Sequence, residues 1–231
     1  MRKEIIVLFL ILCVILTSCK PAEKEEVAEK ETVEKTGPSD VKEESQGMEE
    51  IPVRASMSAE LKELIEKANT VESLEYFYQS KEGGNMDVYV KGTKMKQEFD
   101  PHLIANQYYD TFYIDLSKKT VEGYCETDND FYCEETTSSI TENFNDYITE
   151  TPFDILKLIK SGDVTPGTMV DGRETVIFEV KTEEDYDMKI WLWTYKGIPV
   201  RYEVWDGDEK IRWVDYKNLA INTVKSSDLV H

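Results

Sequence analysis

The sequence predicts an α+β domain in which a single, strongly curved antiparallel sheet wraps around a few helices. The first observation is the order of the patterns: one helical segment, several strands, a helical pair and further strands, without the βαβ alternation of a parallel sheet. The second is the stretch 188–216, MKIWLWTYKGIPVRYEVWDGDEKIRWVDY, which holds three apolar-aromatic runs and all four tryptophans. Such runs, separated by tight turns, are typical of antiparallel strands.

The tryptophan-rich stretch has apolar residues on both of its faces. Lys196-Gly197 and Asp206-Gly207 stand where hairpin turns need residues that tolerate positive φ, which predicts a three-stranded meander. The first strand directs Met188, Ile190 and Leu192 to one side and Trp191, Trp193 and Tyr195 to the other. A sheet with one face in water alternates apolar and polar residues instead. We therefore expect a helix, a loop or a ligand to cover the second face.

The N-terminal residues have the pattern of an export signal. Arg2 and Lys3 precede Ile5–Leu16, an apolar run of 12 residues, which is shorter than the ~20 residues of a membrane-spanning helix. Leu16-Thr17-Ser18-Cys19 resembles the lipobox of prokaryotic lipoprotein signal peptides. The resemblance implies that residues 1–18 are a signal peptide and that Cys19 is lipidated and begins the mature protein. The alternative is an uncleaved anchor helix, or a chance Cys after an ordinary signal.

Residues 19–55 predict a disordered tether rich in acidic residues and lysine. Between Lys20 and Ala55 the sequence has no aromatic residue and is dominated by Glu, Lys, Val, Thr, Ser and Pro. Such a composition cannot bury enough apolar surface to offset the entropy of ordering the chain. The tether would hold the folded domain, residues 56–231, away from the membrane surface.

The first elements of the domain follow from their periodicity. Ser58 and the apolar spacing after it predict a capped amphipathic helix over residues 58–69. Alternation and turn residues predict strands over 73–80, 86–91, 94–99, 109–116, 120–125 and 174–181, a short strand at 131–135, and a loop at 102–108. After the meander, Leu219, Ile221 and Val224 alternate and predict a last, edge strand.

Two helical patterns interrupt the strands. Residues 140–148 are weakly helical, whereas Phe153–Ile159 is more strongly so, with Thr151-Pro152 at its start and Gly162 at its end. The apolar residues of the second segment lie on more than one helical face. This segment is therefore the candidate cover of the sheet.

Two cysteines remain once the signal and the lipidated residue are set aside, Cys125 and Cys133. A pair in an exported domain predicts a disulfide, worth about 2–3 kcal/mol by the entropy of loop closure. A metal site competes with this interpretation because Asp128, Asp130, Glu134 and Glu135 lie in or beside the loop. The loop lacks the ligand spacing of a calcium site, however, and two thiolates without a histidine are a poor zinc set.

Charge and motif content argue against a nucleic-acid-binding protein and against an enzyme. The net charge of −20 is unsuited to a phosphate backbone. The only histidines are His102 and His231, and the sequence has no GxSxG, HExxH or phosphate-binding glycine loop. Asp206-Gly207-Asp208 has the position of a hairpin turn rather than of a DxD metal motif. We therefore expect no enzymatic activity and no cofactor.

The surplus of aromatic and aliphatic residues on the predicted strands favours a cavity. An ordinary core accounts for each such residue alone. A sheet with two apolar faces and few helices, however, indicates a largely apolar concave site for a lipid or another hydrophobic ligand. The candidate ligand-binding residues are Ile190, Trp191, Leu192, Trp193, Tyr202, Val204 and Trp213 on the strands, with Phe153 and Leu156 on the helical segment.

The domain resembles the lipoprotein-carrier fold of LolA, LolB and related proteins. The similarity lies in an aromatic strand that turns through a Gly-hydrophobic-Pro segment into two further strands, here IWLWTYKGIPVRYEVWDGDEKIRWVDYKNLAIN, preceded by VDGRETVIFEVK. In outline it also covers the first helix and strands. The resemblance implies an incomplete β-barrel whose concave side, covered by helices, holds acyl chains. LolB-like members of this family are lipid-anchored, so the resemblance also implies a lipid anchor here, as Cys19 suggests.

Two functions of different classes are expected from these patterns. The first is a lipoprotein anchored by its lipid to the extracytoplasmic face of the cell membrane, where it binds or senses a lipid or acyl chain in the concave sheet. The alternative is an interaction or structural protein with a filled core, whose surface binds another envelope protein.

Overall fold

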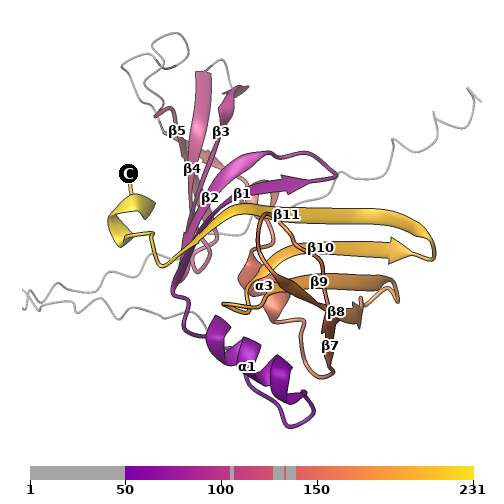
Figure 1. Cartoon of the computed structure of the whole chain (residues 1–231). Coiled ribbons are helices and arrows are strands. Elements are labelled where there is room, and N and C mark those ends of the chain that lie inside the picture. The colour runs from indigo at the N-terminus through magenta and orange to yellow at the C-terminus, as the bar shows by residue number, and fades with distance from the viewer. Residues whose placement is uncertain (1–49, 105–106, 127–132, 134–138) are drawn as a thin grey trace, which may run out of the picture. The chain divides into compact units, whose positions relative to one another are not determined.

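One antiparallel sheet of eleven strands, in the order β6-β5-β4-β3-β2-β1-β11-β10-β9-β8-β7, runs through the protein (Figure 1). The computed structural model describes residues 50–104, 107–126, 133 and 139–231, which belong to the unit Glu44–His231. β6 and β7 lie at the two ends of the strand order and do not pair with each other. The sheet formed by the described residues is therefore not closed into a barrel.

The strands are β1 Ser73–Ser80, β2 Met86–Lys91, β3 Lys94–Ile104, β4 Gln107–Asp115, β5 Thr120–Tyr124, β6 Ile140–Glu142, β7 Val164–Pro166, β8 Thr175–Lys181, β9 Asp187–Trp193, β10 Pro199–Asp206 and β11 Glu209–Ile221. The α-helices are α1 Ala59–Ala68, α2 Phe144–Tyr147 and α3 Pro152–Leu156, and η1 Ser226–Leu229 is a 3₁₀ helix. Among the described residues no helix has the length and apolar character needed to cross a membrane.

The predicted α+β class is wrong, because the described part of the chain is mainly β. Its three α-helices are short, with four residues in α2 and five in α3. Residues 140–142, for which the sequence predicts a helix, pair instead as β6 with β5. Helices of this length cannot fill a curved sheet, so strand side chains supply most of the core. The single antiparallel sheet that the sequence predicts is present in the structure, but it does not wrap around helices.

Several predicted elements lie where their periodicity places them. α1 begins after its N-cap Ser58, and β9, β10 and β11 form the predicted meander, with positive φ at Gly197 and Gly207. The loop predicted at 102–108 is wrong, because β3 runs to Ile104 and pairs His102 with Tyr109 of β4. The strand predicted at 131–135 lies outside the described residues apart from Cys133, and the short strand β7 was not predicted.

The predicted last edge strand is also wrong. Leu219 and Ile221 belong to β11, a strand of 13 residues that lies between β1 and β10 in the middle of the sheet. β1 pairs with β11 from Leu74 opposite Ile221 to Ser80 opposite Val214. This pairing satisfies backbone N–H and C=O groups that two edges would leave open. Alternation of side chains cannot distinguish a central strand from an edge strand.

We call one side of the sheet the inner face; it carries Tyr76, Val88, Ile190, Tyr202, Val214 and Tyr216, all of them buried. α3 contacts β10 from this side and buries Ile155 and Leu156. The continuous core therefore lies on the inner face, beneath α3, which ends at Leu156 and so is shorter than the helical segment predicted over residues 153–159.

α1 packs beside the turn between β9 and β10. The Nζ of Lys67 donates to the carbonyl of Thr194 at 3.3 Å. Gly197 has a φ of 68° and lies so close to α1 that a Cβ there would stand 1.9 Å from the carbonyl oxygen of Leu64. Both the positive φ and the close approach require glycine at this turn.

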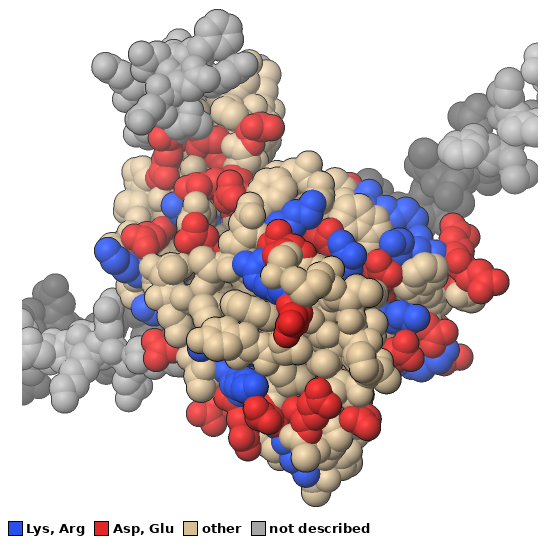
Figure 2. Space-filling model, viewed as in Figure 1, with Lys and Arg blue, Asp and Glu red and all other residues tan. Residues whose placement is uncertain are grey.

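The outer face of β8–β11 is covered by charged side chains of the strands and by Arg173 of the loop before β8, whose Nη2 donates to the carbonyl of Leu219 in β11. Arg201 lies 6.0 Å from the ring centre of Trp191, Arg173 lies 5.2 Å from Trp193, and Lys210 lies 5.6 Å from Trp205. Acidic and basic side chains are interspersed on the face seen in Figure 2. Cations and their aliphatic stems can shield aromatic rings while their charges stay in water. The aromatic rings of the second face are thus covered by cations from β10 and β11 and by the loop before β8, which is one of the covers that the sequence predicts.

Candidate functional site

The crossing segment, residues 147–151, links α2 to α3 on the inner face. Thr151 begins α3 with a reciprocal cap, because its Oγ1 accepts from the backbone N of Asp154 at 3.2 Å and the Asp154 carboxylate accepts from the backbone N of Thr151 at 3.1 Å. Pro152 follows at the start of the helix, and Ile148 and Thr151 are extended. Proline disfavours helix in the residue before it. The two short helices therefore cannot merge, and an extended stretch separates them.

A buried glutamine of β3 holds the beginning of the crossing segment. The Nε2 of Gln97, a residue that is 1% exposed, donates to the carbonyl of Tyr147 at 2.9 Å and lies 3.1 Å from the Oγ1 of Thr149. A buried amide needs such partners, since leaving it without them costs free energy. Gln97 therefore fixes the distance between the crossing segment and β3.

Glu150 ties the other end of the crossing segment to β10 and β11. The Tyr202 hydroxyl donates to its carboxylate. The Nη2 of Arg212 lies 2.9 Å from Oε2, and Nη1 lies 3.3 Å from Oε1. The hydroxyl of Tyr216 donates to the Glu150 backbone carbonyl at 3.0 Å. One residue of the segment thus accepts hydrogen bonds from three inner-face side chains, and charge makes those of the carboxylate the stronger ones.

The electrostatics of this cluster keep its tyrosines protonated. Burial and the neighbouring Glu150 carboxylate raise the pKa of Tyr202, and burial raises the pKa of Tyr216 well above its ordinary value. Both hydroxyls therefore remain hydrogen-bond donors at neutral pH. Two further donors, the Tyr76 hydroxyl and the Arg212 Nε, are buried without a hydrogen-bond partner among the described residues.

Three pockets surround the crossing segment and α3. The largest, of about 850 Å³, has Tyr78, Met86 and Phe99 on the sheet side and Phe144, Tyr147 and Ile148 on the helical side. A second pocket of about 460 Å³ lies by Ile51, Val90 and Phe153, and a third of about 520 Å³ lies by Phe178, Val180 and Leu158. Glu150 and Arg212 line both the largest and the third pocket. These two side chains therefore form a wall that the two pockets share.

The structure separates the predicted ligand-binding residues into two groups. Ile190, Leu192, Tyr202 and Val204 lie on the inner face with Leu156 beside them, whereas Trp191, Trp193 and Trp213 lie on the outer face. Tyr202 and Val204 line the third pocket, and the half-buried Phe153 lines the second. The largest pocket is lined by other residues. Ile190, Leu192 and Leu156 are fully buried core residues.

Sequence reasoning missed Gln97, Glu150 and Arg212. The sequence carries a signal for Gln97 and Arg212, because side chains of a strand alternate between its faces. Arg212 stands in phase with the apolar Val214 and Tyr216, and Gln97 stands in phase with the apolar Met95. A polar residue at an inward position requires a buried partner. Glu150 had no such signal, since it lies between two helical segments.

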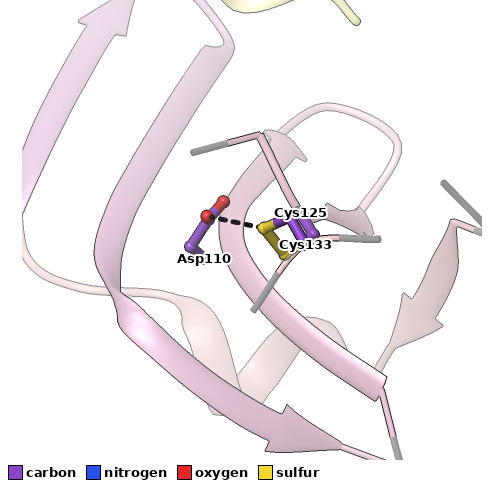
Figure 3. A group of neighbouring side chains, drawn as sticks. All are labelled: Asp110, Cys125 and Cys133. Carbon is purple, nitrogen blue, oxygen red and sulfur yellow. Dashed lines mark hydrogen bonds between the residues drawn. A yellow bond between two sulfur atoms is a disulfide. The ribbon is translucent and has the colours of Figure 1, made fainter. Parts of the chain in front are cut away.

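The structure places Cys125 and Cys133 in a disulfide, as the sequence predicts, with Cα atoms 5.5 Å apart. The buried carboxylate of Asp110 points toward the bond, with its Oδ2 3.6 Å from the Cys133 sulfur (Figure 3). Its Oδ1 accepts from the Thr111 hydroxyl at 2.8 Å and from the Glu126 backbone N at 2.9 Å. Bonded sulfurs offer no thiolate, so this arrangement is a disulfide site and not a metal centre. The predicted lipidation site, Cys19, lies outside the described residues.

No protein-family model and no curated protein sequence matches the chain. Among solved structures, an uncharacterized conserved protein from Thermus thermophilus is 10% identical, with 72% of this chain and 90% of that chain covered and a TM-score of 0.40. MucB is 11% identical over 75% of this chain, with a TM-score of 0.40, and the chain spans only 63% of its length. A LolA superfamily protein from Nitrosomonas europaea is 10% identical, with 75% and 99% covered and a TM-score of 0.28. The similar structures thus include a member of the superfamily that the sequence resembles, but TM-scores this low carry no argument about function.

Proposed function

We propose that this protein is a lipid-anchored extracytoplasmic lipoprotein that binds or senses a hydrophobic ligand, a lipid or acyl chain, on the inner face of its sheet. The observation that carries the proposal is the pocket of about 850 Å³ between the sheet and the crossing segment. Its volume lies within the roughly 300–1,000 Å³ of sites for small molecules, which are typically concave and lined by apolar and aromatic residues. The ligand site is thus shifted from the tryptophans to the neighbouring strands β1–β3.

The lining of this pocket is suited to a chain-like ligand. Tyr78, Met86 and Phe99 offer a flexible thioether and flat rings, and Ile148 at the edge is 41% exposed. Methionine adapts its shape to irregular apolar surfaces, and aromatic rings contribute large contact areas. Gln97, Glu150 and Arg212, which hold the crossing segment, also line this pocket and would orient the ligand.

The membrane attachment rests on the sequence. The lipobox-like Leu16-Thr17-Ser18-Cys19 supports a lipid on Cys19, and the tether that follows supports a domain held outside the membrane. The membrane, through the anchor, and a hydrophobic small molecule are then the partners of the protein. Substituting Cys19→Ser should release the protein from membranes or leave it unprocessed, and membrane attachment identical to that of the unchanged protein would contradict the anchor.

Ligand binding is tested with residues 20–231, which omit the lipidated Cys19 and retain every described residue. A fluorescent acyl probe should bind it, and native mass spectrometry of protein extracted from membranes should detect a bound lipid. Ile148→Asp places a charge at the pocket edge and should weaken the probe about tenfold, which corresponds to about 1.4 kcal/mol.

Met169→Asp is the matched control, since Met169 is 61% exposed and lies away from this pocket. It should leave probe binding unchanged. The proposal fails if neither a lipid nor the acyl probe binds. In that case, crosslinking of the protein in intact membranes to a single stoichiometric envelope protein would favour the alternative function of an interaction protein.

A further inference from the structure

We infer that Arg212 is the head-group site of the ligand, and that a long-chain carboxylate binds there by replacing the side-chain carboxylate of Glu150. The inference rests on the proposed function, because it names the class of hydrophobic ligand that the inner face takes. It is carried by the contacts of Glu150, by the unpartnered donor on Arg212 and by the position of both residues between two pockets.

Glu150 occupies the position of a ligand carboxylate. One of its oxygens accepts from the Tyr202 hydroxyl and lies 2.9 Å from the Nη2 of Arg212, and the other lies 3.3 Å from Nη1. A guanidinium fork facing both oxygens of a planar carboxylate is the common mode of carboxylate recognition. The side chain of Glu150 is 43% exposed, and that of Arg212 is 35% exposed. The carboxylate can therefore leave for water without opening the core.

Arg212 has a donor that Glu150 does not satisfy. Its Nε–H is buried and has no partner among the described residues. A guanidinium has five N–H donors and no acceptor, and a buried donor without a partner carries a free-energy cost. A carboxylate that is not constrained by the backbone of the crossing segment can approach the side of the guanidinium that includes Nε. The internal carboxylate is thus a weaker partner than a free one.

The two pockets that meet at this pair provide room for the chain. Glu150 and Arg212 line both the pocket of about 850 Å³ and the pocket of about 520 Å³. A head group on Arg212 places the first methylene groups at this shared wall. The acyl chain then enters the larger pocket over Tyr78 and Met86, and displacement of Glu150 removes part of the wall toward the smaller pocket.

The remaining charges favour a monoanion. Glu82, Asp146 and Asp154 also line the larger pocket, and Lys157 is paired with Asp154 at 3.0 Å. A doubly charged phosphate monoester would meet more repulsion from these carboxylates than a single carboxylate does. Replacement of one carboxylate by another leaves the charge next to Arg212 unchanged. A fatty acid therefore fits this site better than a phosphorylated lipid.

The test compares a fluorescent long-chain fatty acid with its methyl ester, both titrated into residues 20–231 at neutral pH. The unchanged protein should bind the acid at least tenfold more tightly than the ester. Arg212→Gln should remove this preference by weakening the acid at least tenfold, with little change for the ester. Glu150→Gln removes the internal competitor and should tighten the acid severalfold relative to the ester.

Arg201→Gln is the matched control, because Arg201 pairs with Asp215 on the outer face of the neighbouring strand. It should leave the preference for the acid intact. Binding of acid and ester with equal affinity, unchanged by Arg212→Gln and Glu150→Gln, would overturn the head-group inference and leave the proposed acyl site standing. Failure of both probes to bind would overturn the proposed function as well. Should Arg212→Gln fail to fold, Glu150→Gln still decides, since an unchanged affinity for the acid contradicts the inference.

Discussion

Two arginine–carboxylate pairs lie on opposite faces of β10 and β11, and they differ in what they connect. On the outer face Arg201 pairs with Asp215, which stands directly across from it on the adjacent strand, with Nη2 and Oδ2 3.0 Å apart. On the inner face Arg212 pairs with Glu150, which lies 62 residues away along the chain in the crossing segment. The first pair belongs to the sheet alone. The second ties a separate segment to the sheet, so its loss should change that segment and not the strands.

The largest difference between the two faces should appear in their apolar residues. Leu156 is fully buried against the inner face, whereas Ile177 lies half-buried on the outer face. Leu156→Ala should lower the free energy of unfolding by about 3 kcal/mol, because it leaves a cavity. Ile177→Ala should cost about 1 kcal/mol, because only part of its surface is buried. Urea denaturation of residues 20–231 measures both, and equal costs would contradict a core that lies mainly on the inner face.

The second test separates the two ion pairs themselves. Glu150→Gln should loosen the crossing segment and raise amide hydrogen exchange over residues 143–157 by about tenfold, since a charged hydrogen bond is worth about 1.5–3 kcal/mol. Asp215→Asn removes the charge of the outer pair and should leave the exchange of those amides unchanged. The contrast between the two pairs is lost if both substitutions have the same effect on residues 143–157.

A third test uses acid to weaken the outer face. Burial raises the pKa of Asp115, but hydrogen bonds from Lys94, Ser117 and the Lys118 backbone outweigh it and hold that pKa well below its usual range. A lowered pKa gives stability that is present above about pH 4, the range of an unfolded Asp, and is lost as the pH falls toward the folded pKa. Asp115→Asn should cost about 1 kcal/mol at pH 7, and the cost should vanish as the pH falls. Urea denaturation between pH 7 and pH 2 measures this, and a cost independent of pH would refute the assignment.

The smallest effect is expected for exposed pairs of the outer face. Lys189 lies 3.4 Å from Glu179, and both side chains are largely in water. Lys189→Ala should change the free energy of unfolding by less than about 0.5 kcal/mol, because solvent and salt screen such pairs. A loss above about 1 kcal/mol in the same urea experiment would mean that the charged cover of the outer face stabilises the sheet, rather than only shielding its aromatic rings.

Local features of the fold were predictable because they depend on neighbouring residues. The cap at Ser58, the alternation in β9–β11 and the turns at Gly197 and Gly207 each follow from a few adjacent positions. The strand order was not predictable in the same way. The pairing of β1 with β11 joins residues more than a hundred positions apart, and no local pattern encodes which strand lies beside which.

The residues predicted to line a ligand site lie only partly beside the pockets of the structure. Pockets lie around α3, which overlaps the segment 153–159 that was expected to cover an apolar groove, but Trp191, Trp193 and Trp213, which motivated that expectation, lie on the outer face. Arg201 across from Trp191 covers an aromatic ring that the sequence alone leaves open. Such cover depends on strand register. The partner of Arg212 depends on a contact between distant segments. The alternation of β11 indicates that Arg212 needs a buried partner, but it does not identify Glu150 as that partner.

The pairing of β1 with β11 also determines when the sheet can form during synthesis of the chain. Among the described residues β1 is the first strand and has one of its two neighbours in β11, the last strand, so the middle of the sheet stays open until β11 has been synthesised. Contacts of such long range form slowly, and they leave strand edges exposed in the meantime. A chain that stops before Glu209 would have both β1 and β10 open along the centre of the sheet, which invites association with other chains. The middle of the sheet can therefore close only once β11 is available.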